Sequence, residues 1–322
     1  MAERFNREGA QPPAQAPVAA LDCGTNSTRL LVVDDSGRTL DRQMRITRLG
    51  QHVDATGTLS AEAMDRTLSV LGDYRRKMDE LAVGRARLVA TSAVRDADNG
   101  EEFLAAAAEV ARVPPELLSG DEEGRLSFAG ATAKLPLDFH RHGPLLVVDV
   151  GGGSTELTAG QPGDPASVEV VSLDVGCVRV TERFFVDDPP TRPQLEQARR
   201  EVARQLEAAR AALPPLEPGG PVIGLAGTVS TLAALDLGLD HYDRDSLHHS
   251  RLELSVVQRW LDVLAAEPAT ARRDRPGMVE GRQDVIVGGV LVLVQVMEVF
   301  DRRWCLVSED DILDGLAASQ RR

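Results

Sequence analysis

The chain has 322 residues, which is longer than one hydrophobic core usually grows, so two domains are expected. Its 36 basic and 50 acidic residues give a net charge of −14, and this acidity argues against general nucleic-acid binding. The longest uncharged apolar segment, residues 285–297, spans 13 residues, fewer than the roughly 20 that a membrane-spanning helix needs. This segment therefore predicts a buried helix, and no membrane partner is expected.

The three cysteines, Cys23, Cys177 and Cys305, lie far apart in the sequence. No two of them have the short spacing of a zinc site, and their number does not suggest a disulfide framework. A reducing cytoplasm is the expected location. Residues 1–17 lack the apolar core of a secretion signal and are expected to form a flexible tail.

The first half begins with a short apolar run, residues 18–22, which is typical of a buried strand that ends at Asp22. Four small or polar residues follow it directly: Gly24, Thr25, Asn26 and Ser27. Hydrophobic periodicity and turn residues predict the elements after this loop. They are strands over residues 29–33, 38–49, 87–92 and 116–119, and helices over about 60–81, 101–112 and 119–131.

The second half begins in the same way. Residues 145–149 form an apolar run that ends at Asp149, and a second loop of small and hydroxyl residues follows: Gly151, Gly152, Gly153, Ser154 and Thr155. The stretch 145–157 aligns on 18–30 without gaps and matches Asp149 with Asp22. This match indicates an internal duplication.

After the second loop, the chain repeats the order of three strands, a helix, a strand, a helix and a strand. This order predicts an α/β fold of two ribonuclease H-like domains, residues 18–135 and 136–322, with residues 134–144 as the candidate linker. The last helix is expected to be capped by Ser308 with Asp311 and to pack back on the first domain. The glycine turn within residues 222–230 fits packing and phosphate or nucleoside contact equally well.

Both glycine loops have the composition of a phosphate site. Glycine has no Cβ, so the backbone at residues 151–153 can turn tightly and bring its N–H groups to an oxyanion. The hydroxyl groups of Ser154 and Thr155 add further donors. Two such loops facing one another predict a ligand cleft between the domains.

Five segments, in this order, resemble the exopolyphosphatase and guanosine pentaphosphate phosphatase family, in its short two-domain subgroup. They are residues 22–27 (Asp-Cys-Gly-Thr-Asn-Ser), 90–95 (Ala-Thr-Ser-Ala-Val-Arg), 119–125 (Ser-Gly-Asp-Glu-Glu-Gly-Arg), 149–156 (Asp-Val-Gly-Gly-Gly-Ser-Thr-Glu) and 224–228 (Gly-Leu-Ala-Gly-Thr). The family belongs to the superfamily of actin, sugar kinases and heat-shock chaperone ATPases. The resemblance implies hydrolysis of a terminal phosphoanhydride bond in the interdomain cleft with Mg²⁺, or Mn²⁺ in its place, and makes a homodimer plausible.

The resemblance also implies roles for single residues. Glu123 matches the family's catalytic glutamate. Asp149 and Glu156 match the acids that hold the metal, with Asp22 as the equivalent acid of the first loop. Arg95 matches an arginine that contacts phosphate, and the residues of the two glycine loops are the expected phosphate donors.

The catalytic glutamate lies at a predicted helix start, because Ser119 and Glu122 have the spacing of a capping box. Glu122 is expected mostly to favour the helix dipole, whereas Glu123 would accept a proton from the attacking water. Burial would raise the pKa of Glu123 and the helix N-terminus would lower it. The sequence leaves this balance open.

Four functions are compatible with these motifs. The first is an exopolyphosphatase that releases orthophosphate from chain ends, and the second is a 5′-phosphohydrolase of guanosine pentaphosphate, which shares the same chemistry. A sugar or acetate kinase would need ATP and an acceptor, and a non-catalytic sensor of polyphosphate or an alarmone would need no base. The complete set of acids disfavours the non-catalytic sensor.

Overall fold

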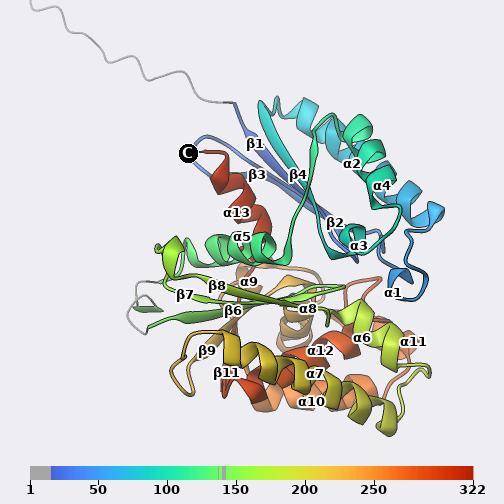
Figure 1. The fold of residues 1–322 in the computed structure, drawn as a ribbon, viewed down its shortest axis with the longest axis vertical. Helices are drawn as coiled ribbons and strands as arrows, with labels where there is room; N and C mark the ends of the chain where they lie inside the picture. Colours follow the sequence, from blue (N-terminus) through green and yellow to red (C-terminus); the bar gives the residue numbers. More distant parts are fainter. Residues whose placement is uncertain (1–15, 137, 140–142, 322) are drawn as a thin grey trace, which may run out of the picture.

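The computed structural model describes residues 16–136, 138–139 and 143–321, which form two bodies, each built on one mixed sheet (Figure 1). The first sheet has the order β3-β2-β1-β4-β5. An antiparallel meander forms one side of it, and two parallel strands extend it beyond β1. Its strands are β1 (Val18–Cys23), β2 (Ser27–Val33), β3 (Thr39–Ile46), β4 (Arg85–Ala90) and β5 (Pro115–Leu117).

The second sheet repeats this arrangement and adds one strand at its edge. Its order is β10-β11-β9-β6-β7-β8, in which β6, β7 and β8 form the meander. Its strands are β6 (Leu145–Val150), β7 (Thr155–Gly160), β8 (Glu169–Leu173), β9 (Pro221–Leu225), β10 (Arg251–Glu253) and β11 (Trp304–Val307). The expected α/β fold of two ribonuclease H-like units is confirmed.

The duplication extends to the pairing register of the two hairpins. In the first hairpin Asp22 lies opposite Arg29, and in the second Asp149 lies opposite Glu156. Each acid therefore lies in the second-to-last residue pair of its hairpin, close to the glycine loop that connects the two strands. The two loops occupy equivalent places in the two bodies.

Helices cover both faces of the first sheet. On one face α2 (Ala61–Glu80) and α4 (Gly100–Ala111) pack over a hydrophobic core that includes Leu21, Leu71 and Phe103. The other face is covered by α13 (Ile312–Ser319), the last helix of the chain, through Leu313 and Leu316 (Figure 1). Two short helices, α1 (Val53–Thr56) and α3 (Ser92–Arg95), complete this body.

The start of α13 differs from the sequence prediction. The expected cap at Ser308 is wrong, because Asp311 is the N-cap and pairs with Asp314 in a capping box. The Ser308 hydroxyl instead donates to the carbonyl of Asp310 at 2.7 Å and accepts from its N–H at 3.2 Å. Residues 308–310 therefore form a local turn before the helix.

The helix α5 (Gly120–Thr132) lies between the two bodies. It begins with the predicted capping box of Ser119 and Glu122. It packs against β7 and β8 of the second sheet and crosses α13. A Cβ at Gly130 would lie 1.9 Å from the Asp311 carbonyl oxygen, so the crossing depends on a residue without a side chain. The proposed domain division at residues 135 and 136 stays a prediction, since α5 and α13 each reach the other body.

The second body is built around α12 (Ile286–Val299), which is buried from Ile286 to Met297, as the apolar run predicted. It packs against α6 (Cys177–Phe184), α7 (Arg192–Ala212), α8 (Ala226–Leu237) and α10 (Leu254–Ala265). The short η2 (Pro165–Ser167), α9 (Arg244–Leu247) and α11 (Ala269–Arg273) lie in the connections. Among the described residues, no helix combines the length and apolarity that a membrane crossing requires. The predicted tail lies almost entirely outside the described residues, as does part of the candidate linker.

Candidate active site

A pocket lies where the two bodies meet, and both glycine loops line it. The first loop contributes Gly24, Thr25, Asn26 and Ser27, and the second contributes Gly151, Gly152 and Ser154. Three acids complete this side of the pocket: Asp22, Glu123 and Asp149. The structure therefore brings together most of the residues that the sequence singled out.

The two loops touch one another across the cleft. A Cβ at Gly152 would lie 2.7 Å from the Thr25 Cβ, and one at Gly153 would lie 2.5 Å from the Ser92 Oγ. Thr25 and Ser92 share a hydrogen bond of 2.9 Å between their hydroxyl groups. The glycines of the second loop are therefore required by the close approach of the first body.

Asp22, Asp149 and Glu156 are buried, and Glu123 is partly buried. Glu156 is not among the described residues that line the pocket. These four acids are only partly hydrogen-bonded. Ser127 donates to Asp149 Oδ2 at 2.9 Å, and Ser172 donates to Glu156 Oε1 at 2.7 Å. Among the described residues, three buried carboxylate oxygens have no hydrogen-bond partner: Asp22 Oδ1, Glu123 Oε2 and Glu156 Oε2. Such atoms are costly unless a proton or a cation satisfies them.

Burial and mutual repulsion raise the pKa values of these acids. The pKa of Glu123 is raised well above its usual value, first by burial and then by Glu156, Asp149 and Asp22. Burial, followed by the charge of Asp149, raises the pKa of Glu156 to about 8. Burial likewise raises the pKa of Asp149 to about 6. For Glu123, burial therefore prevails over the helix N-terminus.

The donor set fits a divalent cation. Within the described residues, no three Asp, Glu, His or Cys side chains lie close enough together to hold one ion by themselves. The unpartnered oxygens of Asp22, Glu123 and Glu156 are carboxylate oxygens, which Mg²⁺ prefers. Mg²⁺ usually takes only one or two carboxylates together with water and phosphate oxygens. The residues present are compatible with that mode of binding.

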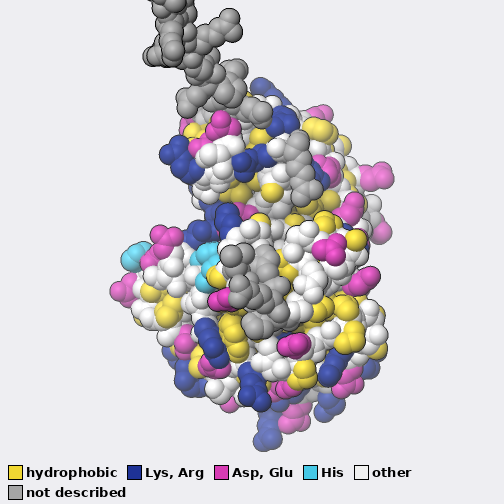
Figure 2. All heavy atoms as spheres, turned by 90° about the vertical axis from the view of Figure 1, so that its left-hand side faces the viewer, with side chains coloured by type: hydrophobic (Ala, Val, Ile, Leu, Met, Phe, Trp, Pro, Cys, Tyr) yellow, Lys and Arg dark blue, Asp and Glu magenta, His cyan; other side chains and the backbone are white. Residues whose placement is uncertain are grey.

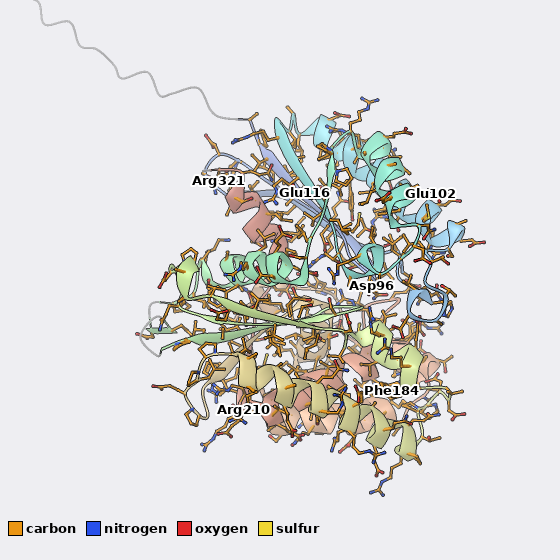
Figure 3. The ribbon with its side chains drawn as sticks, viewed as in Figure 1. Asp96, Glu102, Glu116, Phe184, Arg210 and Arg321 are labelled. Atoms are coloured by element: carbon orange, nitrogen blue, oxygen red, sulfur yellow. The ribbon has the colours of Figure 1, made fainter. Side chains whose placement is uncertain are left out.

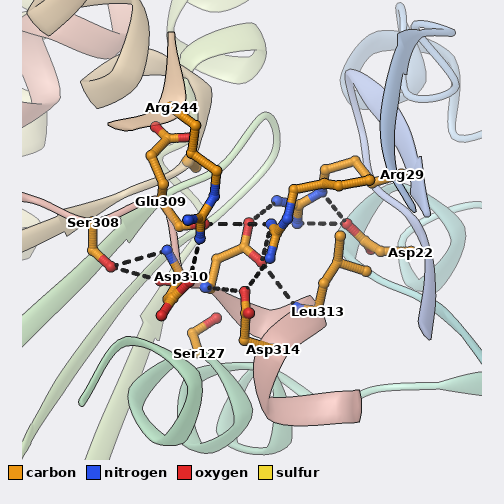
Figure 4. A network of polar contacts seen from close by, with 12 residues as sticks. Asp22, Arg29, Ser127, Arg244, Ser308, Glu309, Asp310, Leu313 and Asp314 are labelled. Carbon is orange, nitrogen blue, oxygen red and sulfur yellow. Dashed lines mark hydrogen bonds and ion pairs between the residues drawn. The ribbon is translucent and has the colours of Figure 1, made fainter. Parts of the chain in front are cut away.

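Arg29 is a site residue that the sequence interpretation missed. It donates to Asp22 Oδ2 from Nε at 2.9 Å and from a terminal nitrogen at 2.6 Å, and it also pairs with Asp311 (Figure 4). The alignment of the two loops held a signal for it, because Arg29 occupies the position that Glu156 has in the second copy. The first body thus has an arginine side chain at the position where the second body has a glutamate.

Three of the expected phosphate ligands are placed differently from the rest. Arg95 lies 3.9 Å from Glu123 Oε2 and donates to the Leu118 carbonyl at 2.9 Å, and it is not among the described residues that line the pocket. The Thr155 hydroxyl is buried and donates to the Val175 carbonyl at 2.5 Å. Gly153 packs behind the loop against Ser92. Phosphate contact by these three residues stays a prediction.

The third glycine turn contributes to the same pocket. Ala226, Gly227 and Thr228 line it, together with Arg282, which donates to Thr231 Oγ1 at 2.9 Å. Gly224 has a packing role, because a Cβ there would lie 2.5 Å from the Cys305 Sγ. Packing therefore explains Gly224, whereas contact of residues 226–228 with phosphate or a nucleoside stays a prediction.

A larger cavity of about 640 Å³ adjoins the pocket and shares Arg29, Ala226, Gly227 and Arg282 with it. Lys and Arg side chains gather at the waist between the two bodies (Figure 2). Two arginines of the cavity are paired with acids: Arg42 lies 2.5 Å from Asp314, and Arg244 pairs with Asp310 (Figure 4). The rest of the lining includes apolar and aromatic groups, namely Met44, Met278, Ala234, Leu313 and Tyr242.

The comparisons with known proteins agree with this geometry. A model of the Ppx/GppA phosphatase family matches residues 31–320. Exopolyphosphatase 2 of Mycobacterium tuberculosis is 41% identical over 322 residues, covering 94% of this chain and 98% of its own length. A solved exopolyphosphatase-like protein superposes with a TM-score of 0.87 at 33% identity, over 95% of this chain and 99% of its own. An exopolyphosphatase from Cytophaga hutchinsonii superposes with a TM-score of 0.84 at 26% identity, over 95% of this chain and 97% of its own. The chain belongs to the Ppx/GppA phosphatase family.

Proposed function

We propose that this protein is an exopolyphosphatase, which hydrolyses the terminal phosphoanhydride bond of inorganic polyphosphate and releases orthophosphate. The observation that carries the proposal is Glu123, a partly buried carboxylate with a raised pKa that lines the pocket formed by two facing glycine loops. The similarity to Exopolyphosphatase 2 of M. tuberculosis and to the exopolyphosphatase from C. hutchinsonii supports it.

The chain's own groups divide the work of phosphoryl transfer between them. Backbone N–H groups of the loops that contain Gly24 and Gly152 bind the oxygens of the terminal phosphate. Glu123 accepts a proton from the water that attacks the phosphorus, while the next phosphate of the chain leaves. Because its pKa is raised, the ionised Glu123 binds a proton more strongly than an ordinary carboxylate does, which favours its role as a base.

Membership of the family implies a divalent metal ion, and we propose Mg²⁺, with Mn²⁺ as a substitute. One or two of the expected ligands Asp149, Glu156 and Asp22 would hold it together with water and phosphate oxygens, and a bound ion would neutralise charge on the phosphates. This assignment is supported by the unpartnered oxygens of Glu156 and Asp22. We further propose that the enzyme is cytoplasmic and that it forms a homodimer. Sedimentation of the purified chain tests the homodimer.

A second candidate is the 5′-phosphohydrolase of guanosine pentaphosphate. The observation that favours it is the adjoining cavity, whose lining by Met44, Met278 and Tyr242 has no obvious use for a chain of bare phosphates. Apolar and aromatic groups suit the flat face of a base. The arginines of this cavity are partly neutralised by acids, which makes it a poor channel for a polyanion.

A direct comparison of substrates tests the proposal. Phosphate release is measured from polyphosphates of defined length and from guanosine pentaphosphate, with Mg²⁺ and with EDTA. We expect release from polyphosphate that needs the metal. Rapid release from guanosine pentaphosphate with none from polyphosphate would reverse the order of the two candidates, and transfer of phosphate to a small acceptor in place of water would indicate a kinase.

A further inference from the structure

The second glycine loop is held from behind by the start of α6. The N–H of Cys177 donates to the Gly151 carbonyl at 2.9 Å, and the N–H of Val178 donates to the Gly152 carbonyl at 2.8 Å. The carbonyl groups of the loop thus bond to the helix terminus.

One side chain of α6 extends this support across the cleft. The Nε of Arg179 donates to the Gly153 carbonyl at 2.9 Å, and one terminal nitrogen donates to Asp54 Oδ1 at 3.0 Å. Its other terminal nitrogen pairs with Asp96. Asp54 and Asp96 belong to the first body, and Figure 3 shows Asp96 at the edge of that body above α6. The guanidinium therefore links the loop of one body to two acids of the other.

This link lies directly behind the contact between the loops. The N–H of Asp96 donates to the Ser92 carbonyl at 2.9 Å, so Asp96 and Ser92 belong to one helical turn. Ser92 is also the residue whose hydroxyl lies against Gly153. By holding Asp96 and Gly153 together, Arg179 fixes the distance between Ser92 and the second loop. Its side chain is 11% exposed, so solvent screens these ionic contacts only weakly.

We propose that Arg179 is a positioning residue for the hydrolysis: it sets the separation of the two glycine loops and thereby the place of the bound phosphate relative to Glu123. This inference rests on the proposed function. Arg179 is not among the described residues that line the pocket, so it acts through Gly153 and does not touch the substrate. A displacement of about 1 Å at a reacting centre lowers a rate by about 10²-fold.

The chain supplies a matched control one turn further along the same helix. Arg183 also crosses the cleft to Asp54, with a contact of 2.5 Å, and its side chain is 40% exposed. Among the described residues it makes no hydrogen bond to the glycine loop. A role that only ties the two bodies together would be shared by both arginines, whereas support of the loop belongs to Arg179.

The test compares R179Q, R179K and R183Q in the full-length protein with Mg²⁺. We measure kcat and KM for phosphate release from polyphosphate, and the melting temperature of each variant. R179Q is expected to lower kcat by about 10²-fold with KM within about threefold, since the loop is displaced but the donors remain. R179K, whose ammonium can keep one of the contacts, should recover part of the loss. R183Q should stay within about fivefold of the wild type.

An unchanged kcat in R179Q, or an equal loss in R179Q and R183Q, would overturn the proposal. If R179Q does not fold, D96N takes its place, with a kcat loss larger than that of R183Q expected and an equal or smaller loss counting against the proposal. If the wild type acts only on guanosine pentaphosphate, the same variants are compared on that substrate. A failure of the proposed substrate is thereby distinguished from a failure of the positioning role.

Discussion

At the scale of single residues, the buried acid Glu156, which lies beside the pocket, links the stability of the fold to pH. Glu156 has a pKa of about 8 in the folded protein against an ordinary value of 4.5, so the folded state binds its proton more tightly than the unfolded state. The stabilisation is complete below the ordinary pKa and is lost as pH rises through about 8. His248 has the opposite sign, but it is neutral in both states above its ordinary pKa of 6.5.

We therefore predict that the melting temperature of the metal-free protein in EDTA falls between about pH 6.5 and about pH 8.5. E156Q should flatten this decline, because it removes the group that ionises in the window. E201Q is the control, since hydrogen bonds from Arg204 and Gln205 lower the pKa of the half-buried Glu201 to about 2 and this residue is ionised throughout. Added Mg²⁺ should raise the melting temperature of the wild type most at high pH, where the acids that would hold it are ionised. A wild-type melting temperature that rises with pH under EDTA would contradict the assignment of raised pKa values.

Single residues also show how far sequence reasoning reached. The acids Asp22 and Asp149 were predictable, because each ends an apolar run just before a glycine loop, and the structure places both in the pocket. Arg29 and Arg179 were missed for different reasons. Arg29 was visible only as a mismatch between the two copies, whereas Arg179 lies on a helix, and its partners Asp54 and Asp96 are more than eighty residues away in sequence.

At the scale of secondary structure, the crossing of α5 and α13 connects the fold to the site. Glu123 lies in the first turn of α5, and the same helix meets α13 without room for side chains. A Cβ at Gly315 would lie 2.1 Å from the Leu126 carbonyl oxygen, a backbone atom that cannot turn aside. The position of Glu123 therefore depends on how closely α5 and α13, two helices far apart in the sequence, approach one another.

We predict that G315A lowers the free energy of unfolding by about 1–3 kcal/mol, as overpacking of a tight contact does, and also lowers kcat because α5 is displaced. The matched control is G72A on α2, where the nearest atom to a new Cβ is the Val110 Cγ1 at 3.7 Å. That variant should gain about 0.5–1 kcal/mol from helix propensity and keep its activity. Urea denaturation and phosphate release measure both effects. If G315A is as stable and active as the wild type, the crossing is not as tight as described.

The start of α5 followed from the spacing of Ser119 and Glu122, since a capping box is a local pattern. The sheet on which α5 packs could not be predicted from the sequence. A helical stripe shows that one face is buried, but not which sheet covers it, and α5 packs on the sheet that comes after it in sequence. The same limit applies to α13, where Ser308 offered a plausible cap but its hydroxyl was already engaged in a turn with Asp310.

At the scale of the whole molecule, the duplication made the cleft predictable. Two copies of one α/β unit, each with a glycine loop at the same place in its sheet, face one another across a pocket. The cross-cleft contacts were not predictable, because they join surface residues of separate domains. Arg48, for example, lies 2.5 Å from Asp284 of the second body. Such contacts depend on the relative placement of the domains, which local sequence patterns do not encode.

The central claim is that Glu123 activates water at a phosphate held between the two loops. The most direct measurement is phosphate release from polyphosphate by E123Q, with E122Q as the control. A glutamine in place of Glu122 would keep the capping contact that Glu122 Oε2 now makes with the Ser119 N–H at 2.9 Å, so E122Q should retain nearly full turnover. E123Q is expected to lose at least about 10²-fold in kcat while polyphosphate still binds. Unchanged turnover in E123Q would contradict the account.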